Sequence, residues 1–125
     1  MENYTDKATA VSAVLSNYFQ GIFTGDVDLL RSTFHPQAVV AGDINGKPYF
    51  KTLDEYLEGV KNRKSPLELG ETFRMDIKSI EIINSIAVAR LHVPMFEFNY
   101  YDLISLNKVN EKWVIVNKLL TNVNV

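Results

Sequence analysis

Apolar side chains at helical spacing mark the first part of the chain. Between residues 5 and 24 they recur every three or four positions, which predicts an amphipathic helix that begins at Thr5 and ends at Gly25. Asp26 is placed to cap a second, short helix, which must end before Pro36 because proline cannot continue it. The linker is so short that the two helices are expected to form a helical hairpin.

The next segment predicts a short strand and a tight turn. Residues 38–43 form the strand, and Asn45-Gly46 is the commonest dipeptide of two-residue hairpin turns. Pro48 is then expected to bend the chain into an exposed link.

A third helix is predicted from Thr52, because Glu55 three residues later completes a capping box. Its apolar positions fall on one face and are Leu53, Tyr56, Leu57 and Val60. Basic residues near Arg63 lie at the C-terminal end of this helix, where the helix dipole favours cations.

The second half of the chain alternates apolar and polar side chains at the two-residue period of strands. Four strands are expected, at residues 73–82, 86–95, 100–108 and 113–123. The alternation slips by one residue before Ile80, which predicts a β-bulge and a bend. Consecutive strands joined by short turns form an antiparallel meander. The predicted fold class is α+β: three N-terminal helices packed on a strongly curved antiparallel sheet, which forms a cone with an apolar pocket.

Both faces of the later strands are apolar. In the last strand one face is assigned Trp113, Ile115 and Leu119, and the other Val114, Val116 and Leu120. A sheet with one face in water normally alternates apolar and polar residues. Because three helices cover only one face, we expect a homodimer through the outer sheet face. A sheet that curls enough to cover itself is the alternative.

Composition limits the classes of protein to which this chain can belong. The 125 residues fit a single domain, residues 1–125, and 46% hydrophobic residues suffice for a core. A net charge of −2 gives no long-range attraction for nucleic acid. The sequence has neither an apolar run of the roughly 20 residues that span a bilayer nor a secretory signal, so we expect a cytoplasmic protein without a membrane partner. The absence of cysteine excludes disulfides and cysteine-based zinc sites.

Several segments together resemble one superfamily. They are Tyr18–Asp26, Leu30 with Phe34-His35-Pro36, Ala38–Gly42, and the hairpin of Asp102–Leu106 with Glu111–Lys118. Over nearly the whole chain the sequence resembles the nuclear-transport-factor-2-like superfamily, of cystatin-like fold. The branch it resembles most is the "putative lumazine-binding" type, near the SnoaL-like polyketide cyclases. The resemblance implies the cone-shaped fold, but the superfamily includes isomerases, cyclases, dehydratases and transport adaptors.

The resemblance also points to one pair of residues. Beside the steroid isomerases of the superfamily, Tyr18 and Asp102 occupy the positions of a phenol and of a protonated carboxylic acid, which donate hydrogen bonds to one ligand oxygen. Asp102 lies on an otherwise apolar strand face, and such surroundings disfavour its ionised form. Alternatively, Tyr18 is an ordinary core residue and Asp102 pairs with Arg90.

The general base of those isomerases has no counterpart at the matching position. They carry an aspartate on the first strand, where this chain has Gly42. Asp43 points to the opposite face unless a bulge intervenes. Steroid isomerisation is therefore not expected, and Asp102 and His35 remain the candidate catalytic acids or bases.

Aromatic side chains favour a binding pocket. The residues expected to surround a small apolar or aromatic ligand are Tyr18, Phe34, Tyr56, Phe96, Tyr100, Asp102, Trp113 and Asn117. The same aromatic residues also suit an ordinary core. Either Asn117 or Lys118 must face inward, where Asn117 would bind a carbonyl or ring nitrogen and Lys118 would pair with Asp102.

The two histidines do not predict a metal site. His35 is either a base at the pocket mouth or a cap of the second helix, and His92 lies either in the pocket or in the dimer contact. Two distant histidines without cysteine are a poor ligand set, and no phosphate-binding or dinucleotide motif predicts a cofactor.

Three functions remain compatible with these features. The favoured one is a binding module for a small cyclic or aromatic molecule. The second is an isomerase, cyclase or dehydratase acting on a small cyclic substrate. The third is a dimerisation or interaction protein with a vestigial pocket.

Overall fold

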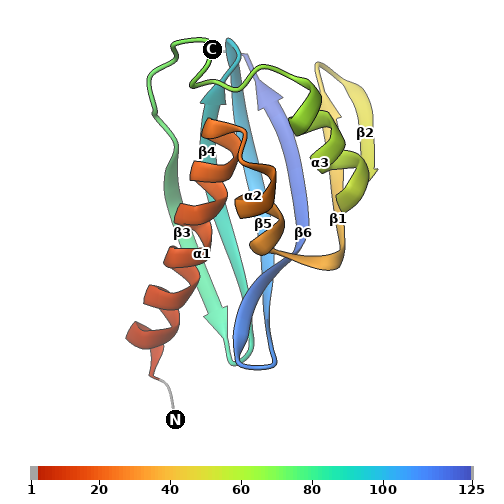
Figure 1. The fold of residues 1–125 in the computed structure, drawn as a ribbon. Coiled ribbons are helices and arrows are strands. Elements are labelled where there is room, and N and C mark those ends of the chain that lie inside the picture. Colours follow the sequence, from red (N-terminus) through yellow and green to blue (C-terminus); the bar gives the residue numbers. More distant parts are fainter. Residues whose placement is uncertain (1–2, 125) are drawn as a thin grey trace.

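The computed structural model describes residues 3–124 and contains a six-stranded sheet with three helices on one face (Figure 1). Residues 1, 2 and 125 of the predicted domain lie outside the described part. In chain order the elements are α1 (Tyr4–Thr24), α2 (Val27–Ser32), β1 (Phe34–Ile44), β2 (Lys47–Thr52), α3 (Leu53–Asn62), β3 (Asp76–Ile83), β4 (Ile86–Met95), β5 (Phe98–Val109) and β6 (Lys112–Val123). The predicted α+β class is confirmed.

Short polar side chains cap the first two helices. Asn3, rather than the predicted Thr5, is the N-cap of α1, and its side chain accepts a hydrogen bond from the backbone N–H of Asp6 at 2.9 Å. The helix ends as predicted at Gly25, which adopts the left-handed conformation (φ 72°). Asp26 then caps α2, also as predicted, by accepting a hydrogen bond from a first-turn N–H at 3.0 Å.

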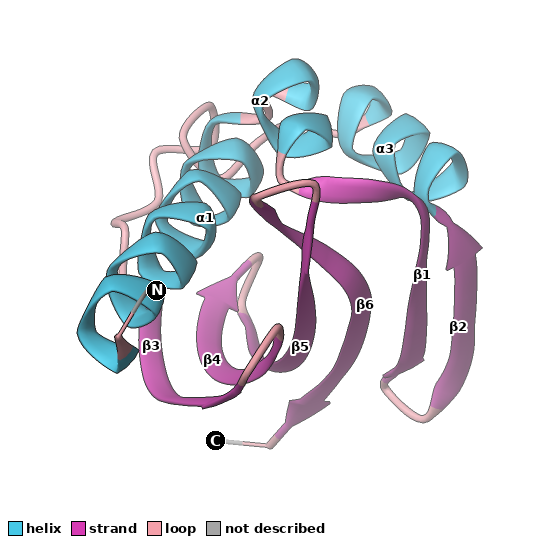
Figure 2. Cartoon of the chain, turned by 90° about the horizontal axis from the view of Figure 1, so that it is seen from below, coloured by secondary structure: helices cyan, strands magenta, loops and turns pink. Residues whose placement is uncertain are grey.

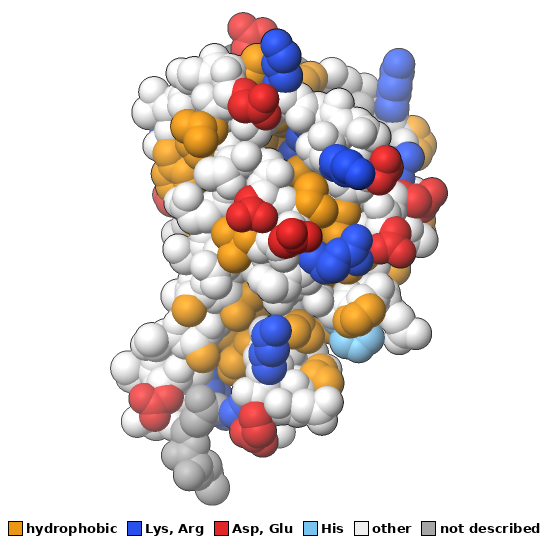
Figure 3. Space-filling view, viewed as in Figure 1, with side chains coloured by type: hydrophobic (Ala, Val, Ile, Leu, Met, Phe, Trp, Pro, Cys, Tyr) orange, Lys and Arg blue, Asp and Glu red, His pale blue; other side chains and the backbone are white. Residues whose placement is uncertain are grey.

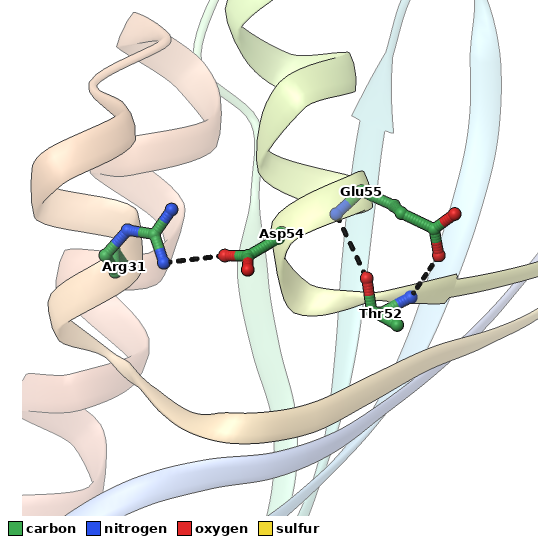
Figure 4. A network of polar contacts seen from close by, with 4 residues as sticks. All are labelled: Arg31, Thr52, Asp54 and Glu55. Carbon is green, nitrogen blue, oxygen red and sulfur yellow. Dashed lines mark hydrogen bonds and ion pairs between the residues drawn. The ribbon is translucent and has the colours of Figure 1, made fainter.

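The predicted capping box of α3 is present. The Thr52 hydroxyl accepts a hydrogen bond from the backbone N–H of Glu55 at 3.2 Å, and Glu55 accepts one from the N–H of Thr52 at 2.9 Å (Figure 4). These bonds lower the pKa of the Glu55 carboxyl. Arg31 of α2 forms an exposed ion pair with Asp54 at 2.9 Å. The start of α3 is thus fixed locally and linked to α2.

The strand order is β2-β1-β6-β5-β4-β3, so the first strand lies beside the last. Strands β3 to β6 form the predicted antiparallel meander. β1 and β6, however, pair in parallel, with Val40 opposite Lys118 and Gly42 opposite Leu120. The prediction of a wholly antiparallel sheet is therefore wrong. The local pattern missed this pair because its strands lie at opposite ends of the chain.

The segment after the Asn45-Gly46 turn is a strand, not the exposed link predicted from Pro48. β2 pairs with β1 as a hairpin, and both turn residues have positive φ, 52° and 77°. Pro48 is compatible with β2 because that strand lies at the edge of the sheet, where proline's missing N–H is tolerated.

One bulge in the sheet was predicted and a second was not. The register of β3 against β4 shifts between Ile77 and Ser79, which confirms the predicted bulge, although β3 begins only at Asp76. The unpredicted shift lies in β6 at Val116.

The β6 bulge changes which side chains face the helices. Leu120 is buried, whereas Leu119 is 45% exposed. Leu119 therefore does not share a face with the buried Trp113 and Ile115, as the regular alternation had predicted. The bulge inserts one residue and reverses the phase of the rest of the strand.

The sheet curves around the helices, which lie on its inner face (Figure 2). Residues of β4 alternate strictly between a buried inner row that includes Ala89 and Val93 and an outer row that includes the exposed Ile86 and Val88. On the helix-covered side of the molecule, charges of both signs are scattered among small apolar areas (Figure 3). Within residues 3–124, no helix combines the length and apolar character needed to cross a bilayer.

Candidate functional site

A cavity of about 70 Å³ lies between α3 and the inner face of the sheet; we call it the inner cavity. Its lining residues are Ile44, Tyr49, Tyr56, Arg63, Val93, Met95, Tyr100, Asp102, Lys118 and Leu120. They come from α3, the residue that follows it and five strands. Three of them are charged, which is unusual inside a small domain because burying a charge is costly. This concentration of charge makes the cavity the candidate site.

Asp102 is the buried acid of the inner cavity. Its side chain is 2% exposed, and its Oδ2 accepts a hydrogen bond from the Tyr18 hydroxyl at 2.6 Å. Burial and then the negative charge of Asp102 raise the pKa of Tyr18 well above its ordinary value, so the phenol remains a donor. Tyr18 and Asp102 therefore meet as expected, but the Tyr18 hydroxyl donates its hydrogen bond to Asp102 rather than to a ligand. The alternative partner, Arg90, is exposed on the outer face.

Lys118 is the buried cation beside that acid. It is 3% exposed, and its Nζ donates a hydrogen bond to the Tyr56 hydroxyl at 2.8 Å. Nζ also lies 4.5 Å from the ring centroid of Tyr56 and 5.1 Å from that of Tyr18. Burial opposes the charge on Lys118, but its attraction to Tyr56 and Asp102 prevails and raises the pKa of the amine. Lys118 is thus a cation at neutral pH.

Arg63 brings a second cation to the inner cavity. It is the residue that follows α3, and its Cζ lies 4.9 Å from the centroid of the Phe96 ring. Its Nε and Nη2 are buried and have no hydrogen-bond partner among the described residues. Unpaired buried donors are rare because each carries the cost of lost hydration.

The lining residues that retain partial exposure mark the mouth of the cavity. They are Ile44, Tyr49 and Arg63, whereas the other lining side chains are buried. Burial raises the pKa of Tyr49 and of Tyr100, so both phenols are neutral at physiological pH. The cavity therefore has an arginine at its entrance and the Asp102 and Lys118 groups at its inner end.

Only three of the residues predicted to bind ligand line the cavity: Tyr56, Tyr100 and Asp102. Tyr18 and Phe34 do not line the cavity but lie behind the lining residues. The ring of Phe34 contacts those of Tyr18 and Tyr56, each at a centroid distance of 6.1 Å. These two residues therefore support the lining.

The other three predicted binding residues lie elsewhere. Phe96 is in the β4–β5 turn, beneath Arg63. Trp113 is buried opposite Lys108, beside the β5–β6 turn. Asn117 pairs with Val39 and Ser105 on the outer face, because the bulge at Val116 turns Lys118 inward instead. The structure thus gives Lys118 the inward position that the sequence left open.

Neither histidine reaches the inner cavity. His35 lies in β1, where its Nδ1 accepts a hydrogen bond from the backbone N–H of Gln37 at 3.0 Å, and Thr33 rather than His35 caps α2. His92 is on the outer face, where it hydrogen-bonds Asn99 and stacks on Tyr101 at 4.6 Å. His35 is therefore not a candidate acid or base of the inner cavity.

The structure also explains Gly42, the position of the missing base. Its φ is 139°, and a Cβ there would lie 1.9 Å from the carbonyl oxygen of Leu120. No side chain fits at this close approach of β1 to β6. Asp43 does not replace the base, since its carboxylate accepts a hydrogen bond from the Thr121 hydroxyl at 2.6 Å and lines a hollow of the outer face.

Arg63 and Tyr49 are the polar lining residues that sequence reasoning missed, along with the apolar residues Ile44, Val93, Met95 and Leu120. The position of Arg63 was fully explained by the dipole at the end of α3, and Tyr49 fell in a segment read as an exposed link. Lys118 did carry a usable signal, because it is a lone charge within an apolar strand. The lining residues as a whole give the cavity hydrogen-bond donors, one carboxylate and aromatic walls. This arrangement is suited to binding a small molecule.

Comparison with known proteins agrees with this description. Residues 6–121 match the model of a family described as "Putative lumazine-binding". Among curated proteins, no relative matches the chain.

Solved structures of similar fold include proteins of unknown function. One is an NTF2-like protein from Shewanella baltica OS155, with a TM-score of 0.87, 25% identity and 100% of both chains covered. Another, from Silicibacter pomeroyi DSS-3, has a TM-score of 0.88 and 18% identity over 98% of this chain and 100% of the other. A putative dehydratase of the NTF2-like family from Streptomyces avermitilis has a TM-score of 0.69 and 11% identity, over 98% and 100%.

Proposed function

Because this chain belongs to the family described as "Putative lumazine-binding", in the nuclear-transport-factor-2-like superfamily, we propose that it binds a small molecule in the inner cavity. The inner cavity lies between α3 and the inner face of the sheet. Asp102, Lys118 and Tyr56 make the polar contacts, and Val93, Met95 and Tyr100 supply the apolar walls.

One observation carries this proposal: two oppositely charged side chains, Asp102 and Lys118, face the same small cavity while each is at most 3% exposed. Apolar side chains of similar volume would fill this space at equal or lower free energy. Charged groups at such a position therefore favour a role in recognition.

The size of the cavity restricts the ligand. At about 70 Å³, it is far smaller than the pockets of roughly 300–1,000 Å³ that hold drug-sized molecules. One water needs roughly 10–15 Å³ by the same measure, so the space corresponds to about five to seven water-sized groups. The cyclic or aromatic ligand is thus a single small ring, unless the mouth at Tyr49 widens.

Thermal unfolding with a panel of single-ring compounds tests the proposal. A compound present at 100 times its dissociation constant stabilises the protein by about 2.7 kcal/mol. Val93→Phe fills the inner cavity and is expected to abolish this stabilisation. Val88→Phe, the same change on the outer face of the same strand, is the control and is expected to retain it. If Val93→Phe responds to the compound as the wild type does, the ligand binds elsewhere and the proposal fails.

An enzymatic role is the second candidate. It is favoured by the presence of a carboxyl group and an amine in one cavity, because both are groups that can act as general acids or bases. The isomerase, cyclase or dehydratase reaction would then use Asp102 as the acid or base. Asp102→Asn separates the two roles, because an enzyme that uses this carboxyl group as acid or base loses far more turnover than substrate affinity, whereas a binding module loses affinity alone.

We also propose that the outer sheet face joins two copies of the chain. It exposes Ile83, Ile86, Val88, Leu103 and Leu119, each by 42–63%. Two shallow hollows of about 430 and 540 Å³ lie on this face. Of their charged lining residues, Glu81 and Arg90 are exposed and Asp43 is partly exposed, so these hollows suit a protein surface better than a small ligand.

A further inference from the structure

We propose that the ligand of the inner cavity carries a carboxylate, which the guanidinium of Arg63 binds side-on at the mouth. This inference rests on the proposed function, since it names the chemical class of the ligand for the same cavity. It depends on three observations: the free donor pair of Arg63, the way its guanidinium is held, and the charge balance of the lining.

The free donors of Arg63 are the pair that matches a carboxylate. Nε and Nη2 are the two guanidinium nitrogens that are buried without a partner. Nη2 lies trans to Cδ, so its inner N–H bond runs parallel to the N–H of Nε. This edge of the planar fork accepts the two oxygens of one carboxylate in a bidentate pair.

The guanidinium is held by an aromatic ring beneath it. Its Cζ lies over the ring of Phe96, which is held in the β4–β5 turn at a positive φ of 56°, an uncommon conformation for a bulky residue. Both carboxylate oxygens of Glu71 accept a hydrogen bond from the Phe96 N–H at 3.1 Å. The nearby acid thus holds the turn beneath Arg63, and the turn positions Arg63.

The charge balance of the lining also favours an anion. Arg63 and Lys118 are cations, Asp102 is the only acid among the cavity's lining residues, and the raised pKa values keep Tyr49 and Tyr100 neutral. The lining residues therefore carry one more positive charge than negative charge. A monoanionic ligand supplies the missing charge and satisfies the unpaired donors in one step.

Size and geometry complete the description of the ligand. A carboxylate contributes three heavy atoms, which leaves room within 70 Å³ for a short chain or a small ring. That part would lie against Val93, Met95 and Tyr100, and a polar substituent at its far end would reach Asp102 or Lys118. The ligand class is therefore a compact monocarboxylic acid.

Methionine-methyl NMR on the full chain tests this inference. The probes are cyclopropanecarboxylate and propionate, each compared with its neutral amide, in a low-salt buffer because salt screens charge. The Met95 methyl group lines the cavity and is expected to shift on titration, whereas Met75, which is not a lining residue, is the internal reference. We expect each carboxylate to bind roughly tenfold to a hundredfold more tightly than its amide, as hydrogen bonds to a charged group predict.

Arginine variants identify the residue responsible. Arg63→Met is expected to abolish the preference for the acid, and Arg63→Lys to restore only part of it, because lysine has the charge but not the parallel donors. Arg74→Met removes an exposed arginine that does not line the cavity and is expected to change nothing. Should Arg63→Met unfold, Arg63→Lys alone still reports the loss of the donor pair.

The outcomes separate this inference from the proposed function. Equal binding of acid and amide, unchanged in Arg63→Met, would overturn the carboxylate while the binding function stood. Inorganic phosphate that shifts Met95 at the same concentration as the acids would also contradict the inference, because the site would then bind any oxyanion rather than a carboxylate. If neither acids, amides nor phosphate shift Met95, the proposed function fails as well.

Discussion

Each face of the sheet departs from the usual distribution of polar and apolar side chains. The inner face lies under the helices and yet buries the charges of Asp102 and Lys118. The outer face is open to solvent and yet exposes Ile86, Val88 and Leu103 by 53%, 42% and 45%. Burial of apolar surface alone explains neither the two buried charges nor the exposed apolar side chains.

Each face therefore carries a free-energy cost that folding alone does not explain. On the inner face the cost is desolvation of two charges, which we attribute to a ligand. On the outer face it is exposed apolar surface, which we attribute to a second copy of the chain. Perturbing one face at a time tests whether these attributions are independent.

The largest effect is expected where the sheet itself is broken. Gly42→Ala would place a Cβ 1.9 Å from the Leu120 carbonyl oxygen and force an alanine to a φ of 139°. Because this separates β1 from β6 and disturbs both faces, we expect a loss of at least about 4 kcal/mol in the free energy of unfolding, measured in urea.

Gly59→Ala is the matched control for that variant. Gly59 lies in α3, where an added Cβ meets nothing within 4 Å. The same substitution there is expected to stabilise the protein by about 1 kcal/mol, because alanine is the better helix former. A Gly42→Ala protein as stable as the wild type would show that the β1–β6 contact is not as close as described.

The next largest effect is expected on the inner face. Asp102→Ala leaves the Tyr18 hydroxyl without its acceptor and Lys118 without its counter-charge, so we expect a loss of about 3 kcal/mol. Tyr18→Phe removes only the hydrogen bond and is expected to cost about 1 kcal/mol. Equal losses in the two variants would mean that the charge of Asp102 contributes nothing beyond accepting that bond.

A smaller effect is expected on the outer face. Leu103→Lys adds a charge at the centre of the exposed apolar rows and is expected to weaken the dimer at least about tenfold, or 1.4 kcal/mol. Sedimentation equilibrium measures the dissociation constant. Monomer stability should change by less than about 0.5 kcal/mol, as for other surface substitutions. A wild type that sediments as a monomer at micromolar concentration would remove the basis for this prediction.

The smallest effect at physiological pH is expected for the free energy of unfolding as the pH is raised. The folded-state pKa values of Lys118, Tyr18, Tyr49 and Tyr100 are all raised. Their contribution is therefore complete below pH ~10, the ordinary value for these groups, and is lost as the pH rises through the folded-state values. Urea unfolding from pH 7 to 11 should give a level profile and then a decline. A free energy of unfolding that begins to fall below pH 9 would contradict this prediction.

Local features of the fold were predictable from the sequence, whereas non-local ones were not. The Thr52–Glu55 capping box and the Asn45-Gly46 turn depend on neighbouring residues, so the pattern revealed them. The parallel pairing of β1 with β6 depends on strands far apart in sequence. β2 was missed because Pro48 argues against a strand unless its edge position is known.

The candidate site was predicted only in part for the same reason. Asp102 was found through the resemblance to the steroid isomerases, and its position on an otherwise apolar strand face supported that choice. Lys118 could not be oriented because the β6 bulge at Val116 leaves no mark in an apolar run. Arg63 was missed because a cation at a helix end already has an explanation, and only the folded chain places it at the cavity.

The central claim is that the polar groups of the inner cavity serve a ligand rather than the fold. The most direct measurement is the free energy of unfolding of the variant Tyr18→Phe/Tyr56→Phe/Asp102→Leu/Lys118→Met, which replaces both hydrogen-bonded pairs with apolar side chains. The account predicts that this variant is as stable as the wild type or more so. A loss as large as the sum of the four single substitutions would contradict it, because the network would then be part of what holds the fold together.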